Sequence, residues 1–383
     1  MEKIYFDHAA TSWPKPPQVL AAINSYFTDY GANINRGGYQ AAYGAAEIVY
    51  ETRERLAALF NFPDCKNTVF TANITAALNL LLKGLLRPGD HLLTSSMEHN
   101  AVMRPLQQLA RQGVEFDCLP CDERGRLLLE HLPALCRPQT RAVTLTHASN
   151  VCGTLMPIAE VGRFCRERGL FFIVDSAQTA GIFPIDMQAM CIDALAFTGH
   201  KGLLGPQGTG GMILSDELAA RLEPLISGGT GSISHTEDIP AFLPDRFEAG
   251  TLNLPGLFGL HAALRYLTET GLDTIREREL ALTGLFLQAA AELPRLKLLG
   301  LSGIEGRAPV VALQTPEHDE AEIAQGLAER GVMTRVGMHC APRAHRTLGS
   351  YPTGALRFSF GHTNTEAEIA AAVAHLERLT HGF

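Results

Sequence analysis

Apolar and polar positions alternate between two patterns from about residue 67 to residue 215. Short runs rich in β-branched and aromatic residues predict strands, namely NTVFT, HLLTSS, RAVTLTHAS, LFFIVDSAQ, DALAFTGHK and GTGGMILS. Between them, apolar residues recur at helical spacing from Ile74 to Leu86, and Pro157 opens a helical segment that closes at Gly169. This alternation predicts an open, mostly parallel sheet with helices on both faces.

The pattern changes after residue 251 to longer helical stretches. Only APVVALQT and ALRFSFG are typical of strands there, and a last helix is expected from Thr365. Because 383 residues exceed the usual size of one hydrophobic core, two domains are expected. We predict a large α/β domain over residues 15–255, and a small α+β domain over residues 1–14 and 256–383. The proline-rich residues 13–17 would form the crossing segment.

Composition narrows the kind of protein. A net charge of −8, with scattered Lys and Arg, argues against a nucleic-acid partner. No apolar run reaches the roughly 20 residues of a membrane helix, and the first residues lack the apolar segment of a signal peptide. We therefore expect a cytoplasmic protein without membrane association, whose eight cysteines stay as thiols.

Candidate chemistry lies at the carboxyl ends of the predicted strands, where open α/β sheets bind ligands. Asp175 ends the run LFFIVD, and Lys201 follows Thr198 and His200 on a glycine-rich loop. A lone acid at a strand end is more often a helix cap, and a lone lysine is more often a solvated charge. A functional role is favoured at both positions because further candidate residues occur at successive strand ends.

Pyridoxal phosphate needs a lysine for its imine, a carboxylate on its pyridinium nitrogen, an aromatic or imidazole face, and phosphate donors. Lys201 and Asp175 satisfy the first two needs. His99 follows another strand and could stack on the ring, while Ile74 and Thr75 begin a helix whose free N–H groups favour a phosphate. The residues thus predict pyridoxal phosphate as the cofactor.

Cys340 is the candidate nucleophile among the cysteines. It lies in RVGMHCAP, a stretch of small residues and a proline that predicts an exposed loop. A reactive thiolate needs a cationic neighbourhood, and Arg335, His339, Arg343 and His345 could supply it. The alternative is a buried, inert cysteine, which we expect for the other seven.

Cys118 and Cys121 form a lone CxxC. No second pair or histidine at ligand spacing accompanies them, so no metal site is expected, and a redox role has little support.

A set of motifs extends over nearly the whole chain: YFDHAAT at 5–11, NRG at 35–37, MEHNA at 97–101, HASNVCG at 147–153, DSAQ at 175–178, TGHK at 198–201, EAGTLN at 248–253 and RVGMHCAP at 335–342. Together they resemble the class V aminotransferase family of fold-type I pyridoxal phosphate enzymes, and within it the group II cysteine desulfurases with selenocysteine lyase activity. The resemblance implies a seven-stranded sheet domain and a smaller domain that carries the cysteine loop and a substrate-binding arginine. Such relatives usually have two histidines before the cysteine, whereas here the first position is Met338.

The resemblance also implies a role for each matched position. Lys201 would carry the cofactor, Asp175 would pair with its ring nitrogen, and His99 would stack on it and could act as an acid. The other implied cofactor contacts are Ile74, Thr75, Gln178, Thr198 and His200, together with Gly250 and Thr251, which would reach the partner subunit's cofactor in a homodimer. The implied substrate contacts are Asn150 and Arg357, together with Asn35 and Arg36.

The implied reaction converts L-cysteine to L-alanine, with the sulfur held as a persulfide on Cys340 before it passes to an acceptor protein or thiol. L-selenocysteine is a competing substrate, because a selenol leaves more readily. A class V aminotransferase would use the same lysine and aspartate with an α-keto acid. A non-catalytic, cofactor-holding sensor is a third alternative, but the intact Lys201, Asp175, Arg357 and Cys340 argue against it.

Overall fold

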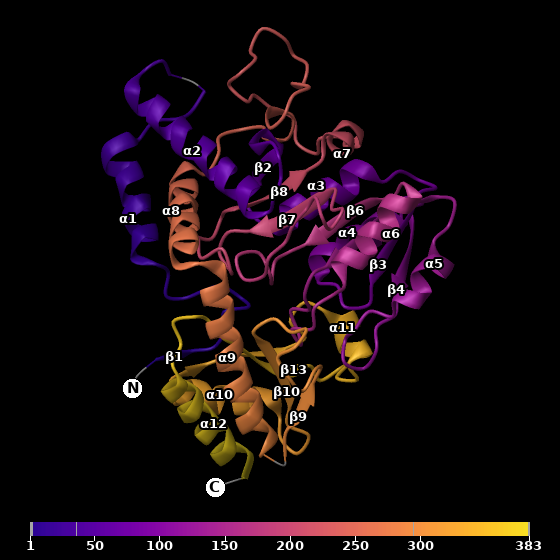
Figure 1. The fold of residues 1–383 in the computed structure, drawn as a ribbon, viewed down its shortest axis with the longest axis vertical. Helices are drawn as coiled ribbons and strands as arrows, with labels where there is room; N and C mark the ends of the chain where they lie inside the picture. Colours follow the sequence, from indigo (N-terminus) through magenta and orange to yellow (C-terminus); the bar gives the residue numbers. More distant parts are fainter. Residues whose placement is uncertain (1–2, 36, 294, 382–383) are drawn as a thin grey trace.

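The computed structural model describes residues 3–35, 37–293 and 295–381. A seven-stranded sheet dominates it, with strands in the order β2-β8-β7-β6-β5-β3-β4 (Figure 1). Strand β8 runs opposite to the other six strands, which are parallel to one another, so the sheet is mostly parallel, as predicted. The strands are β2 (Thr68–Thr71), β3 (His91–Ser95), β4 (Glu115–Leu119), β5 (Thr140–Thr146), β6 (Phe171–Asp175), β7 (Ala194–Thr198) and β8 (Gly210–Leu214).

Alternate side chains of these strands enter two separate cores, one on each face of the sheet. Leu92 of β3 packs in one core and Leu93 in the other, and Ile173 and Phe172 of β6 divide in the same way. The first core is covered by α3 (Ile74–Leu85), α4 (Asn100–Ala110) and α7 (Asp216–Arg221). The second is covered by α2 (Gln40–Leu59), α6 (Ile158–Arg168) and α8 (Leu254–Thr270). Burial on both faces explains why the strands are nearly continuous apolar runs.

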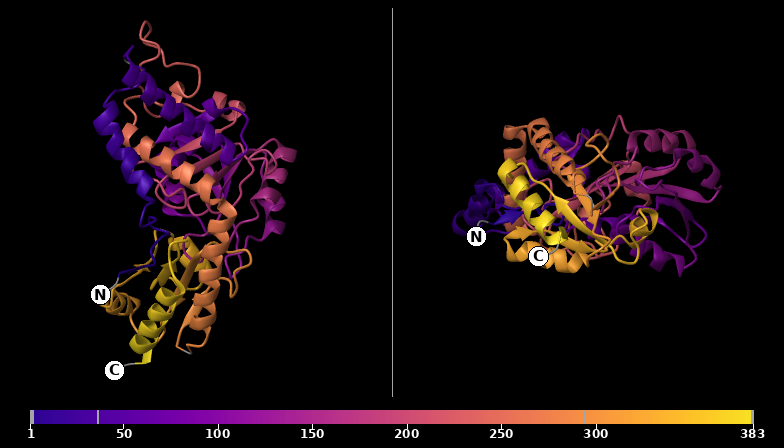
Figure 2. Two further views of the ribbon diagram at one scale, coloured as in Figure 1. Left: turned by 60° about the vertical axis from the view of Figure 1, so that its left-hand side comes forward. Right: turned by 90° about the horizontal axis from the view of Figure 1, so that it is seen from below.

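A smaller α+β unit packs below the large sheet and carries both ends of the described chain (Figures 1 and 2). Its antiparallel sheet has the order β12-β13-β10-β9, and a short parallel pair joins β1 to β11. Both strands predicted for this region are present, as β10 and β13. The strands are β1 (Ile4–Tyr5), β9 (Lys297–Leu299), β10 (Val310–Gln314), β11 (Val332–Met333), β12 (Arg335–Gly337) and β13 (Ala355–Ser359), and the helices are α9 (Leu272–Ala291), α10 (Glu320–Glu329), α11 (Pro342–Thr347) and α12 (Glu366–His381).

Helix α8 lies beside α1 (Pro17–Ser25) and α2, and its Leu257 and Leu260 enter a core of the large sheet. The predicted domain boundary after residue 255 remains a prediction, and it falls two residues into this helix. The short remaining elements are the π-helical Tyr26–Tyr30, the 3-10 turns Cys65–Asn67, Leu129–His131 and Asp245–Phe247, and α5 (Leu132–Leu135). Within the described ranges, no helix is both long and apolar enough to cross a membrane.

Two hydrogen bonds join the loop that contains Cys340 to the segments that follow the parallel strands β3 and β5. The N–H of Asn100, the first residue of α4, donates to the carbonyl oxygen of Cys340 at 2.8 Å. The side-chain Nδ2 of Asn150, just after β5, donates to the carbonyl oxygen of His339 at 2.7 Å. The cysteine loop is therefore held at the edge of the sheet where ligands of α/β proteins bind.

Candidate active site

A cavity of about 220 Å³ lies at the carboxyl ends of β5, β6 and β7, between the starts of α3 and α4. It brings together most of the positions that the sequence predicted. They are Ile74, Thr75, His99, Asn150, Asp175, Gln178, Thr198, His200 and Lys201. Asn73, at the predicted phosphate-binding helix start, also lines the cavity, as do four residues to which the sequence assigned no role: Ala10, Ala101, Thr146 and Ala177.

Lys201 and Asp175 face the same cavity, and burial shifts the pKa of each. Burial, reinforced by the positive charge of Arg357, lowers the pKa of Lys201 to about 8. Burial raises the pKa of Asp175, although its Oδ1 accepts the Ala177 N–H at 2.9 Å. A lysine in this range has an unprotonated fraction near neutral pH, which is the form that attacks a carbonyl carbon.

His99 caps α4, and its Nδ1 accepts the N–H of Ala101 at 3.0 Å. Burial, reinforced by the positive charge of Lys201, lowers its pKa to about 4. The imidazole is therefore neutral at neutral pH, and its one proton is on Nε2. Its neighbour Glu98 is fully buried, and burial raises the pKa of that carboxyl to about 8.

The start of α3 offers a site for an anion. The Asn73 side chain caps this helix by accepting the Ala76 N–H at 3.0 Å, and the N–H groups of Ile74 and Thr75 have no partner within the helix. Thr198 Oγ1 and His200 Nδ1 are buried and have no hydrogen-bond partner among the described residues. Buried donors without a partner are rare, so these atoms fit a phosphate group that would complete them.

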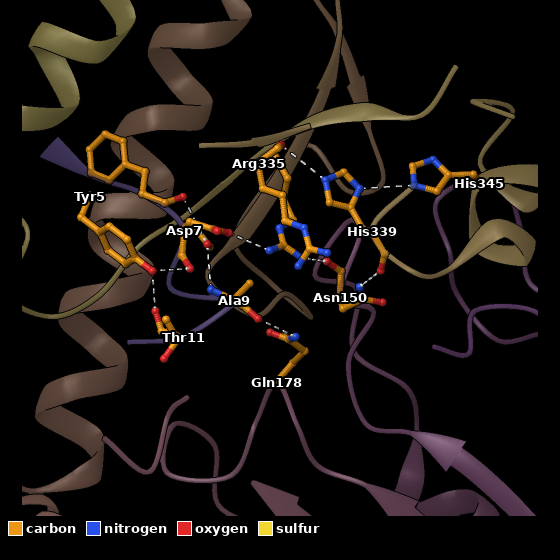
Figure 3. A network of polar contacts seen from close by, with 12 residues as sticks. Tyr5, Asp7, Ala9, Thr11, Asn150, Gln178, Arg335, His339 and His345 are labelled. Atoms are coloured by element: carbon orange, nitrogen blue, oxygen red, sulfur yellow. Dashed lines mark hydrogen bonds and ion pairs between the residues drawn. The ribbon is translucent and has the colours of Figure 1, made fainter. Parts of the chain in front are cut away.

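Arg357 lies beside the cavity on β13 and is only 1% exposed. Its Nη1 donates to the carbonyl oxygen of Asn150 at 2.9 Å, and its Nη2 pairs with Asp7 Oδ1 at 2.8 Å. Figure 3 labels the two partners, Asp7 and Asn150. The remaining Nε is buried and has no partner in the described chain. Asp7 had not been predicted as a site residue, although it lies inside the motif YFDHAAT.

The Cys340 loop follows β12, and the thiol is exposed, as predicted. The predicted cationic neighbourhood is wrong in part, because two of its members are buried. Burial lowers the pKa of His339 to about 2 and that of His345 to about 4, so both are neutral at neutral pH. Arg343 instead directs its Nη1 to the Sγ of Cys118 at 3.3 Å.

The remaining predicted residues lie outside this cavity. Asn35, Gly250 and Thr251 line a separate pocket of about 50 Å³. The wall of that pocket includes a buried ion pair, in which Arg53 and Glu248 meet through two hydrogen bonds of 2.7 and 2.6 Å. Arg36 lies outside the described residues.

The other cysteines differ from Cys340. Cys152 and Cys165 are buried, as predicted, but the prediction of burial is wrong for five that are only partly buried, namely Cys65, Cys118, Cys121, Cys136 and Cys191. Burial still raises the pKa of Cys118 to about 11 and that of Cys121 to about 12. Across the described ranges, no cluster of three His, Cys, Asp or Glu side chains could hold a metal ion.

Comparisons with known proteins agree with this geometry. The aminotransferase class-V family matches residues 4–371. A protein of Methanothermobacter thermautotrophicus named "probable cysteine desulfurase" is 33% identical over 99% of this chain and 95% of its own length. The cysteine desulfurase of Shigella sonnei is 34% identical over 98% of this chain and 93% of its own.

Among solved structures, the apo cysteine desulfurase of Thermococcus onnurineus superposes with a TM-score of 0.92 and 31% identity, covering 100% of this chain and 95% of the other. The sequence similarity and the structural similarity both extend over almost the full length of this chain. The chain belongs to the aminotransferase class-V family.

Proposed function

We propose that this chain is a pyridoxal phosphate-dependent cysteine desulfurase, which converts L-cysteine to L-alanine and holds the sulfur as a persulfide on Cys340. The observation that carries the proposal is the position of an exposed thiol. The backbone of Cys340 is hydrogen-bonded to the first residue of α4, the helix that His99 caps at the wall of the cavity. The names of the relatives support the same reaction.

The cavity fits pyridoxal phosphate. Lys201 would form the imine, Asp175 would pair with the ring nitrogen, His99 would stack on the ring, and Gln178 would approach its phenolic oxygen. The unpaired Thr198 Oγ1 and His200 Nδ1, with the first turn of α3, would hold the phosphate. When bound, this cofactor supplies an electron sink for the bonds at the substrate α-carbon.

Two residues beside the cofactor would carry out the proton transfers. The free amine of Lys201 would take the substrate α-proton on Nζ, because its lowered pKa keeps part of the amine unprotonated near neutral pH. His99 holds a proton on Nε2 and is the candidate donor to the product. Arg357 and Asn150 would bind the substrate carboxylate, since the buried Nε of Arg357 lacks a partner among the described residues.

Cys340 makes the step that distinguishes a desulfurase from an aminotransferase. Its thiolate attacks the sulfur of the substrate, so that an S–S bond forms as the substrate's C–S bond breaks. The electron pair of the C–S bond stays with the carbon fragment, which is protonated and leaves as alanine. An acceptor thiol or protein later removes the persulfide sulfur.

The variant Cys340→Ser tests this assignment. We expect sulfide release from cysteine to be abolished while cofactor absorbance stays intact, because the serine hydroxyl cannot accept the sulfur. Undiminished cysteine turnover would reject the role of Cys340. Turnover of selenocysteine alone, or accumulation of pyridoxamine phosphate with cysteine and pyruvate, would favour the lyase or the aminotransferase alternative.

We also propose a cytoplasmic homodimer. Asn35, Gly250 and Thr251 line a pocket apart from Lys201, so their predicted contacts with substrate and cofactor require a second subunit. Leu225 and Ile226 have exposed apolar side chains, and they line a further cavity together with Thr251.

A further inference from the structure

The imidazoles of His339, the residue before the exposed Cys340, and of His345 in α11 lie stacked on each other. His339 is 3% exposed and His345 is fully buried, and their ring centroids are 5.6 Å apart with an angle of 21° between the planes (Figure 3). Neither ring lines the cofactor cavity. Their burial calls for a structural or functional reason, since a polar ring without hydrogen bonds is costly in the interior.

A single chain of hydrogen bonds accounts for every ring nitrogen of the pair. His339 Nε2 lies 3.4 Å from the carbonyl oxygen of Arg335, His339 Nδ1 lies 3.4 Å from His345 Nε2, and His345 Nδ1 lies 2.7 Å from Ser350 Oγ. A carbonyl oxygen only accepts, so the proton of His339 is on Nε2. Its Nδ1 must then accept from His345 Nε2–H, and His345 Nδ1 accepts from the Ser350 hydroxyl. Both rings are neutral in this arrangement.

This chain of hydrogen bonds supports an unusual backbone conformation at residues 339 and 340. His339 and Cys340 both have left-handed φ values, of 47° and 55°, which two consecutive non-glycine residues rarely adopt. The carbonyl groups of these residues accept from Asn150 Nδ2 and the Asn100 N–H, which fixes the loop from the side of the cavity. The His339 ring gives the loop a further attachment, because it is held between the Arg335 carbonyl oxygen and His345.

We propose that His345, oriented by Ser350, is a positioning residue that holds the backbone of Cys340 in its left-handed conformation and so sets the place of the thiol. This inference rests on the proposed function of Cys340. His345 does not touch the substrate or the cofactor in this proposal, and it acts on the loop through His339 and through the backbone of Met338.

The test compares His345→Leu with His345→Gln in the cofactor-loaded enzyme. Leucine removes the donor to His339 Nδ1, whereas the glutamine amide can still donate. The exposed His131 offers a matched control as His131→Leu. Two quantities are measured: amide hydrogen exchange of Asn100 and Ala341, whose N–H groups bond to Cys340 and Met338, and the single-turnover rate of persulfide formation.

We expect His345→Leu to exchange both amides faster and to transfer sulfur about 10²-fold more slowly, as misplacement of a reacting group does. Cofactor absorbance and the KM for cysteine should stay unchanged. His345→Gln should recover at least about tenfold of that loss, and His131→Leu should match the wild type. If His345→Leu does not fold, Ser350→Ala provides the test and should lower the rate several-fold with faster exchange.

Wild-type exchange and rate in His345→Leu would overturn the proposal, as would a His345→Gln variant no better than the leucine variant. If the wild type itself forms no persulfide on Cys340, the proposed function fails instead. The exchange measurement would still decide whether His345 holds the loop.

Discussion

At the scale of single residues, burial sets the charge of the groups around the cavity. It lowers the pKa values of Lys201, His99 and His200, to about 8, 4 and 4, and it raises that of Asp175. The histidines are therefore neutral hydrogen-bonding groups rather than cations. A cofactor that carries a protonated ring nitrogen and a phosphate would restore charge partners to Asp175 and to the helix start.

The substitution Asp175→Asn tests the pairing of this carboxylate. An amide has nearly the same shape but cannot stabilise a protonated ring nitrogen by charge. We expect kcat for cysteine to fall by about 10²-fold or more, with cofactor still bound. Steady-state kinetics with absorbance spectra measure both quantities, and Asp64→Asn, at an exposed ion pair with Lys66, is the control. An unchanged kcat would show that Asp175 does not have this role.

Glu279 allows a prediction about stability and pH. Burial raises the pKa of this carboxyl from 4.5 to about 8. Between these two pH values the folded state keeps a proton that the unfolded state releases, so the contribution of Glu279 to stability is lost as pH rises toward 8. Glutamine does not titrate. We expect the unfolding free energy of the wild type, relative to Glu279→Gln, to decrease by an amount on the order of a few kcal/mol from pH 4 to pH 8.

Denaturant unfolding at several pH values measures this difference. A difference that stays constant with pH would contradict a buried, neutral Glu279.

At the scale of elements, the strand ends could be predicted because the apolar runs end where the chemistry begins. Asp175 ends β6 and Thr198 ends β7, as their runs predicted. Strand β4 was missed, because this edge strand carries Glu115 and Asp117 and only Leu119 is buried in it. Strand β8 is antiparallel both to β7, the preceding strand, and to the distant β2, and the apolar pattern of a single strand does not contain its direction.

The first turn of α3 provides a test of the anion site. Asn73→Ala removes the cap on Ala76 N–H, and we expect a loss of about 1 kcal/mol in stability. Affinity for pyridoxal phosphate should fall several-fold, because the same turn would bind its phosphate. Fluorescence titration of the apoenzyme and chemical denaturation measure the two effects. Ser215→Ala, which uncaps α7, is the matched control and should lose stability without losing affinity. Equal affinity losses in the two variants would reject the site.

At the scale of the whole molecule, the site depends on contacts between distant parts of the chain. Arg357 pairs with Asp7 across 350 residues, and the Cys340 loop bonds to α4 and to Asn150. The sequence predicted the candidate residues through their motifs. It could not predict the Arg357–Asp7 pair or the hydrogen bonds between His339 and His345, because both depend on tertiary packing.

A homodimer is the prediction at this scale. Asn35, Gly250 and Thr251 can contact a substrate or cofactor only if a second subunit brings its own cavity to them. Light scattering after size-exclusion chromatography should give twice the chain mass of 41.5 kDa. A monomer with full cysteine turnover would contradict the dimer and the roles assigned to these three residues.

The central claim is that Cys340 accepts the substrate sulfur. Mass spectrometry of the cofactor-loaded enzyme after addition of L-cysteine tests it most directly. We predict an added mass of about 32 units on the peptide that contains Cys340, which a reducing agent removes and which Cys340→Ser lacks. Turnover of cysteine to alanine without a sulfur adduct on that peptide would contradict the account.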